Sequence, residues 1–232
     1  MIKKVKRIVR ILLGELFPSF LFGYKSYSQY GEDMMLKSFI EAEYPVGYKG
    51  FYVDIGAHHP FRFSNTAHFY KKGWHGINIE PTPTLIKKFY SLRRRDININ
   101  AAVGNSDEPL LFYLFNEPAL NSFDKELSLC RETDRYKIID IIEIPLEKIS
   151  SILDKNLPEG TEITFMTVDA EGWDFEVLES NDWLKYRPKF ILVEDDTDLD
   201  SIMSSKVYNY LKEKEYQLIG KTLITSIYKR IN

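Results

Sequence analysis

Four acidic residues each follow an apolar run, at the positions where an α/β protein would form a nucleotide-sized site. Each run is typical of a buried strand, and the acids are Asp54, Glu80, Asp169 and Glu194. Ligands of open α/β sheets bind beyond the carboxyl ends of the strands. A buried carboxylate is costly unless it binds something. One such acid fits a cap or a salt bridge, whereas four on one rim predict a site.

The turn after the first run contains one glycine and two histidines. Phe51–Ile55 is the predicted strand, and Gly56 lets backbone N–H groups approach a ligand because it has no Cβ. Glu80 ends the second run and is suited to binding the two hydroxyls of a ribose. His58 and His59 stand where a dinucleotide-binding turn carries further glycines. The turn therefore does not favour a pyrophosphate cradle.

Strands and helices alternate along the chain, which predicts a parallel sheet with helices on both faces. The last two strands predict an antiparallel hairpin at the end of that sheet. Residues 116–137 are polar, and we expect an irregular lid or binding loop there. The predicted strands are 51–55, 76–80, 97–103, 110–115, 139–146, 163–169, 189–194, 216–219 and 223–228, and the predicted helices are 34–41, 65–72, 83–95, 172–180 and 205–214.

The composition is that of one globular domain with an ordinary core. The chain has 232 residues, of which 44% are hydrophobic and 28% charged. Acidic residues outnumber basic ones, which argues against a nucleic-acid-binding surface over the whole domain. A single cysteine excludes an internal disulfide and suits a reducing compartment, so we expect a cytoplasmic protein. No histidine or cysteine spacing indicates a structural zinc site.

The N-terminal segment has its own pattern, and we place a boundary between residues 1–27 and a domain over 28–232. Residues 1–10 carry five basic side chains and no acid, and an apolar run follows that Arg10 and Glu15 interrupt. Pro18 ends the run before it is long enough to span a bilayer. The pattern predicts a basic amphipathic helix. Peripheral membrane contact through residues 1–22 and docking on the domain's own core or on a partner subunit, as in a homo-oligomer, both stay open.

The site features favour one cofactor class over another. A nicotinamide enzyme would carry a Gly-x-Gly-x-x-Gly turn and a second domain, and this chain shows neither. S-adenosylmethionine has a ribose for Glu80, an amino-acid tail for the Gly56 turn, and a sulfonium cation compatible with acidic surroundings. It has no pyrophosphate. The alternatives are a nicotinamide-dependent oxidoreductase and a non-catalytic binding module.

Seven motifs run in order over most of the chain: SQYGED (28–33), FYVDIGAHHP (51–60), SNT (64–66), GWHGINIEP (73–81), AAVGNSD (101–107), VDAEGWDFEVLES (168–180) and RPKFILVED (187–195). In these motifs the chain resembles the FkbM-type S-adenosylmethionine-dependent methyltransferases. The resemblance implies a Rossmann-like class I methyltransferase fold with a seven-stranded sheet, and O-methylation, often of sugars in glycans or natural products. The His58-His59-Pro60 turn departs from the family's pattern.

The resemblance also implies roles for cofactor-binding residues. Asp54 and Gly56 would contact the methionine part, and Glu80 the ribose. The adenine would rest near Ala101, Ala102 and Asp107. The residues that would form a lid or contact the cofactor tail are Tyr30, Glu32 and Asn65.

Methyl transfer to a hydroxyl needs a group that removes the proton. Asp169 is the first candidate for this catalytic base, and His58 or His59 is the second. Alternatively Asp169 and Glu194, helped by Glu171 or Asp174, would hold a divalent metal that acidifies the hydroxyl. Oxygen ligands would favour Mg²⁺ or Ca²⁺ over zinc. The expected partner is a small-molecule or glycan substrate.

Overall fold

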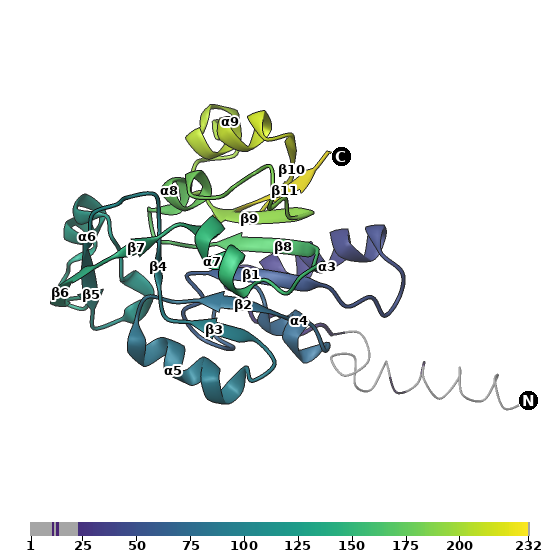
Figure 1. Ribbon diagram of the computed structural model, residues 1–232, viewed down its shortest axis with the longest axis horizontal. Coiled ribbons are helices and arrows are strands. Elements are labelled where there is room, and N and C mark those ends of the chain that lie inside the picture. Colours follow the sequence, from purple (N-terminus) through teal and green to yellow (C-terminus); the bar gives the residue numbers. More distant parts are fainter. Residues whose placement is uncertain (1–10, 12, 14–22, 232) are drawn as a thin grey trace, which may run out of the picture.

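The computed structural model describes residues 11, 13 and 23–231, and it confirms the predicted α/β architecture. The main sheet has seven strands in the order β10-β11-β9-β8-β1-β2-β3 (Figure 1). All are parallel except β11, which runs antiparallel to both of its neighbours. The strands are β1 Phe51–Ile55, β2 His75–Ile79, β3 Ile97–Ile99, β8 Ile163–Val168, β9 Phe190–Glu194, β10 Tyr216–Lys221 and β11 Thr225–Arg230.

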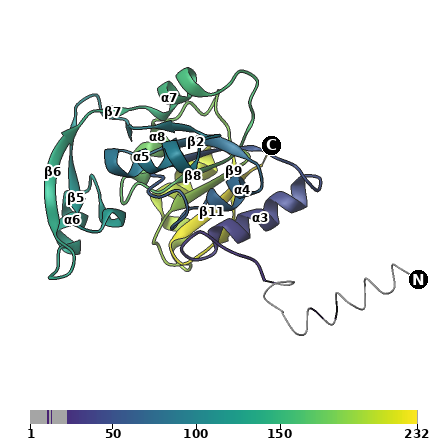
Figure 2. The same cartoon turned by 90° about the horizontal axis from the view of Figure 1, so that it is seen from below.

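Helices cover both faces of this sheet (Figure 2). On one face, the buried rings of Tyr52 and Phe165 pack with Leu36 of α3 (Glu32–Glu43) and Phe69 of α4 (Ala67–Lys71). On the other, alternate strand residues such as Val53 pack in one cluster with the buried sides of three helices. These are α7 (Ile149–Asn156), α8 (Asp174–Glu179) and α9 (Lys206–Glu213), while α5 (Pro83–Leu92) packs beside β3.

A second, smaller unit stands beside the main sheet, at the left of Figures 1 and 2. Here β5 (Leu110–Phe115) and β6 (Ile138–Ile144) form an antiparallel pair. Between them lie the 3₁₀-helix η1 (Pro118–Leu120) and α6 (Lys125–Arg131). We call residues 110–144 the insert. A short parallel pair of β4 (Ala102–Val103) and β7 (Leu146–Glu147) joins its two ends to the domain.

Three predictions of local structure were wrong. The strand expected over 97–103 ends at Ile99, because the Asn100 amide donates to the carbonyl oxygens of Glu80 and Pro81, at 2.8 Å each, and β4 then pairs elsewhere. The segment expected to be irregular contains α6, which Asp124 caps by accepting a hydrogen bond from the Leu127 amide at 2.9 Å. Helix α7 was not predicted at all.

The prediction for residues 1–22 falls outside the described residues, apart from 11 and 13, and the boundary at 27/28 stays a prediction. Among the residues that the structure describes, no helix has the length and apolar character needed to cross a bilayer.

Candidate functional site

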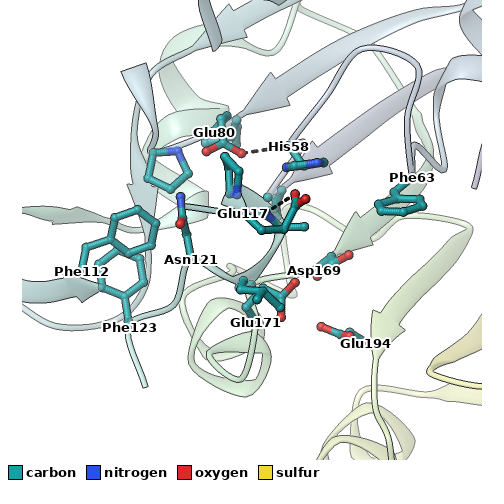
Figure 3. A pocket seen from close by; sticks show the side chains of 18 of the residues that line it. His58, Phe63, Glu80, Phe112, Glu117, Asn121, Phe123, Asp169, Glu171 and Glu194 are labelled. Atoms are coloured by element: carbon teal, nitrogen blue, oxygen red, sulfur yellow. Dashed lines mark hydrogen bonds between the residues drawn. The ribbon is translucent and has the colours of Figure 1, made fainter. Parts of the chain in front are cut away.

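A cavity of about 520 Å³ lies where β1, β2, β8 and β9 end, and the insert forms its other wall (Figure 3). This volume is within the range of small-molecule sites. Six of the predicted site residues line it together. They are Gly56, His58, Glu80, Ala101, Asp169 and Glu194.

Gly56 is required by the crossing of two chain segments at the cavity floor. Its φ is +75°, and a Cβ there would lie 1.7 Å from the carbonyl oxygen of Asp169. Its amide and that of Ala57 both donate to the carbonyl oxygen of Ile79, at 3.0 and 3.1 Å. The turn after β1 is therefore fixed against β2 on one side and against the end of β8 on the other.

Glu80 is a buried carboxylate held by backbone donors. The His58 amide donates to its Oε2 at 2.9 Å and the Thr82 amide to its Oε1 at 2.8 Å. Burial raises the pKa of Glu80, and these bonds oppose the rise. Each oxygen keeps a second lone pair. The arrangement leaves a fixed acceptor pair for the hydroxyls of a ligand.

A second group of carboxylates lines the same cavity. Asp169, Glu171 and Glu194 each offer an oxygen within 4.8 Å of the others. Burial, and then the charges of Glu194 and Glu171, raise the pKa of Asp169 well above its usual value. Burial, followed by the neighbouring carboxylates, raises the pKa of Glu194 to about 8. Asp169 and Glu194 therefore hold a proton more readily than exposed carboxyl groups do.

Glu171 is already neutralised by the insert. Its Oε2 lies 2.6 Å from Nη1 of Arg131 at the end of α6. This ion pair connects the insert to the loop that follows β8.

The two histidines of the turn have different surroundings. Neither ring nitrogen of His58 has a hydrogen-bond partner among the residues that the structure describes. Burial lowers the pKa of His58 to about 4, so the ring is neutral near pH 7. His59 does not line the cavity, and its Nδ1 accepts from the amides of Phe61 and Arg62 at 3.1 Å each. His59 thus shapes the turn, and of the two histidines His58 alone lines the cavity.

Backbone strain is concentrated at this cavity. In the described part of the chain, four non-glycine residues have positive φ, and three of them line the cavity. These are His58 at 49°, Phe63 at 54° and Glu171 at 51°. Each such conformation costs of order 1–3 kcal/mol and persists where the surroundings impose it, which is common at binding sites.

Six further predicted residues do not line the cavity. Asp54 lies beneath it and accepts a hydrogen bond from the Thr66 hydroxyl at 2.5 Å, and burial raises its pKa to about 6. The Asn65 amide donates to the Thr167 hydroxyl. The others are Ala102 in β4, the exposed Asp107 and Tyr30, and the buried Glu32, which accepts from the Tyr30 amide and the Thr222 hydroxyl.

The insert supplies cavity residues that the sequence analysis did not name. Phe112 and Phe123 pack against each other with ring centroids 4.5 Å apart and ring planes tilted by 33°, beside Asn121 and near Glu80 in Figure 3. Glu117 pairs with Arg62 of the turn after β1, at 3.1 Å between Oε1 and Nη1. The sequence signal for Glu117, Asn121 and Phe123 was the length of segment 116–137, whereas Phe112 lies in the strand predicted over 110–115.

The chain is similar to a known protein family. Residues 54–218 match the family model described as the methyltransferase FkbM domain. No match was found among the curated proteins.

Two solved structures resemble the chain. Methyltransferase FkbM from Methylobacillus flagellatus KT is 15% identical with a TM-score of 0.46, over 78% of this chain and 43% of that protein's length. Precorrin-6y C5,15-methyltransferase from Geobacter metallireducens GS-15 is 11% identical with a TM-score of 0.39, over 84% and 87%.

Proposed function

The chain belongs to the FkbM methyltransferase family, and on this premise we propose that it transfers a methyl group from S-adenosylmethionine to a hydroxyl of a sugar. Methyltransferase activity follows from the family, whereas the sugar hydroxyl and the groups that assist the transfer are our proposal. One observation carries it: a ribose-sized acceptor pair on Glu80 and a proton-accepting pair at Asp169 face one cavity.

The residues present fit this cofactor. The glycine turn after β1 leaves room that a Cβ would fill, and we assign it to the amino-acid tail. Glu80 would accept from the ribose hydroxyls. Ala101, which follows β3, lines the same cavity as the paired rings of Phe112 and Phe123, and these would give the adenine an apolar and aromatic surface.

Asp169 is the proposed base, with Glu194 setting its strength. S-adenosylmethionine supplies an electrophilic methyl group whose transfer leaves a neutral thioether. Asp169 takes the hydroxyl proton as the acceptor oxygen attacks. Its raised pKa brings its basicity closer to that needed near neutral pH, which contributes on the order of 10²–10⁴ in rate. His58, whose pKa is lowered, is a weaker base and is better suited to hold the acceptor by a hydrogen bond.

A divalent metal such as Mg²⁺ on Asp169 and Glu194 is the competing assignment for the same carboxylates. A metal would have to displace the protons that the raised pKa values of Asp169 and Glu194 favour, and Glu171 is already paired with Arg131. Asp174 neither lines the cavity nor belongs to the three carboxylates whose oxygens converge, and its carboxylate accepts from the amides of Ala170 and Gly172 at 2.8 and 3.2 Å. We therefore favour the base.

Aromatic side chains at the rim of the cavity support a sugar as the methyl acceptor. Phe63, which is 41% exposed, and Tyr136 present aromatic surface there, and aromatic faces pack against the C–H faces of sugars. The experiment is a calorimetric titration with S-adenosylhomocysteine, followed by methyl transfer to a panel of glycans. Absence of binding at millimolar S-adenosylhomocysteine would overturn the cofactor assignment.

We also propose that residues 1–22 bring the enzyme to membranes that carry a lipid-linked glycan, because residues 1–10 carry five basic side chains and no acid. Deleting residues 1–22 should reduce partition onto vesicles containing anionic lipid. Unchanged partition would contradict this.

A further inference from the structure

Three arginines line the cavity together with its carboxylates. Arg62 is paired with Glu117, and Arg131 with Glu171. Arg135 also lines the cavity, and it forms no ion pair with any residue in the described part of the chain. Its positive charge is therefore available to a ligand.

The backbone that carries Arg135 is held in place. The Asn116 amide group donates to the carbonyl oxygen of Arg135 at 3.0 Å and accepts from the Lys137 amide at 2.9 Å. The Thr133 amide donates to the carbonyl oxygen of Tyr136 at 2.8 Å, and the Thr133 hydroxyl accepts from the Tyr136 amide at 3.1 Å. A fixed backbone reduces the entropy lost when the guanidinium binds an anion.

We propose that Arg135 binds an anionic group of the acceptor, a phosphate or a carboxylate attached to the sugar, and thereby determines which acceptors are methylated. This inference rests on the proposed function and deepens it. A guanidinium presents a planar fork of donors that matches two oxygens of a phosphate or a carboxylate. A neutral sugar has no anionic group, so the Arg135 guanidinium would remain hydrated.

The position of Arg135 assigns it to the acceptor and not to the cofactor. The turn after β1 and Glu80 define the cofactor side at the ends of β1 and β2, whereas Arg135 adjoins Tyr136, which lines the cavity where we place the acceptor. An acceptor that reaches from Asp169 at the floor to Arg135 on the insert has its anionic group apart from the hydroxyl that is methylated.

The test uses the full chain saturated with S-adenosylhomocysteine and measures binding of three probes by calorimetry: glucose 1-phosphate, glucuronate and methyl glucoside. We expect one of the two anionic probes to bind about 10- to 100-fold more tightly than methyl glucoside. The anionic probe that binds more tightly shows whether the site takes a phosphate or a carboxylate. Arg135→Gln should abolish the difference, and Arg135→Lys should restore part of it, because Lys keeps the charge without the fork.

Lys137→Gln is the matched control. Lys137 is exposed in the same loop and does not line the cavity, so its loss removes one positive charge without touching the subsite. Equal affinity for neutral and anionic probes overturns the proposal, and so does an anion preference that survives in Arg135→Gln. Weaker S-adenosylhomocysteine binding in Arg135→Gln, with unchanged sugar binding, reassigns the residue to the cofactor. Failure of the wild-type chain to bind S-adenosylhomocysteine contradicts the proposed function instead.

Discussion

The carbonyl oxygen of Asp169 occupies the space that a side chain on Gly56 would need, 1.7 Å from the ideal Cβ position. The proposed cofactor turn and the proposed base are thus in direct contact across β1 and β8. Neither segment can shift at this point without moving the other. The relation explains why the first strand's turn has a glycine although it lacks the remaining glycines of a dinucleotide-binding motif.

Replacing this glycine should disable the site. Gly56→Ala must displace the Asp169 backbone and also adopt a φ of +75°, which costs an L-residue roughly 1–2 kcal/mol. We expect S-adenosylhomocysteine binding to weaken at least about tenfold, measured by calorimetry. Gly160→Ala is the control, since Gly160 has a φ of +72° with nothing within 4 Å of a Cβ. It should lower stability slightly and leave binding intact. Equal binding by both variants would contradict the coupling.

A buried ion pair supports the floor beneath the turn. Arg93 is fully buried, pairs with Asp96 at 2.8 Å, and donates to the Pro60 carbonyl oxygen at 3.0 Å and the Thr66 hydroxyl at 3.0 Å. Arg93→Met should lower the free energy of unfolding by about 3–5 kcal/mol, because Asp96 is left as an uncompensated buried charge.

Denaturant titration measures this loss, and Arg94→Met is its control. Arg94 is exposed, so its replacement should stay within about 0.5 kcal/mol of wild type. A wild-type midpoint for Arg93→Met would show that the network does not support the fold.

The contrast between Arg93 and Glu80 shows what the sequence could and could not reveal. Glu80 follows a five-residue apolar strand, and a parallel sheet places every such end on one edge, so its position follows from local pattern. Arg93 ends an amphipathic helix, where a cation normally meets solvent, and contacts with Tyr52, Pro60 and Thr66 from other segments bury it. Local pattern does not contain those contacts.

The same distinction applies within the site. Asp169 was identified because it ends a strand, and the sheet brings it to Glu194. Arg131 and Phe123 lie in a segment without strand or helix periodicity strong enough to predict its path. Their approach to the cavity depends on long-range pairing of β5 with β6, which sequence spacing does not specify.

Activity should rise with pH if Asp169 and Glu194 act as the base. The two carboxylates must be deprotonated before Asp169 can take the proton of the acceptor hydroxyl, and burial raises the pKa of Glu194 to about 8. Below that pH, kcat/KM should fall as protons bind, by up to about tenfold per unit. The measurement is a pH–rate profile for methyl transfer.

Glu194→Gln should move the rising limb of that profile to lower pH and lower its plateau. Removing the Glu194 charge lets the pKa of Asp169 fall toward its usual value, which also makes Asp169 a weaker base. Asp196→Asn, an exposed neighbour on the same loop, should leave the limb unchanged. A limb that stays in place in Glu194→Gln would exclude the pair as its origin.

Substitution of Glu171 distinguishes the proposed base from the competing metal site, because the two assignments give Glu171 different roles. As a base, Asp169 works with Glu194, and Glu171 only pairs with Arg131. Asp169→Asn should then lower kcat by about 10²–10⁴ with S-adenosylhomocysteine binding retained, Glu171→Gln should keep most of the activity, and a chelator should change nothing. A metal would instead take one ligand oxygen from each of the three carboxylates, whose oxygens lie within 4.8 Å of one another. Both variants would then lose activity alike, and the chelator would abolish it in the wild type until Mg²⁺ is restored. That second pattern would show that these residues hold a metal and do not act as a base. Loss of the Glu171–Arg131 ion pair could lower the activity of Glu171→Gln, but it could not explain inhibition of the wild type by a chelator.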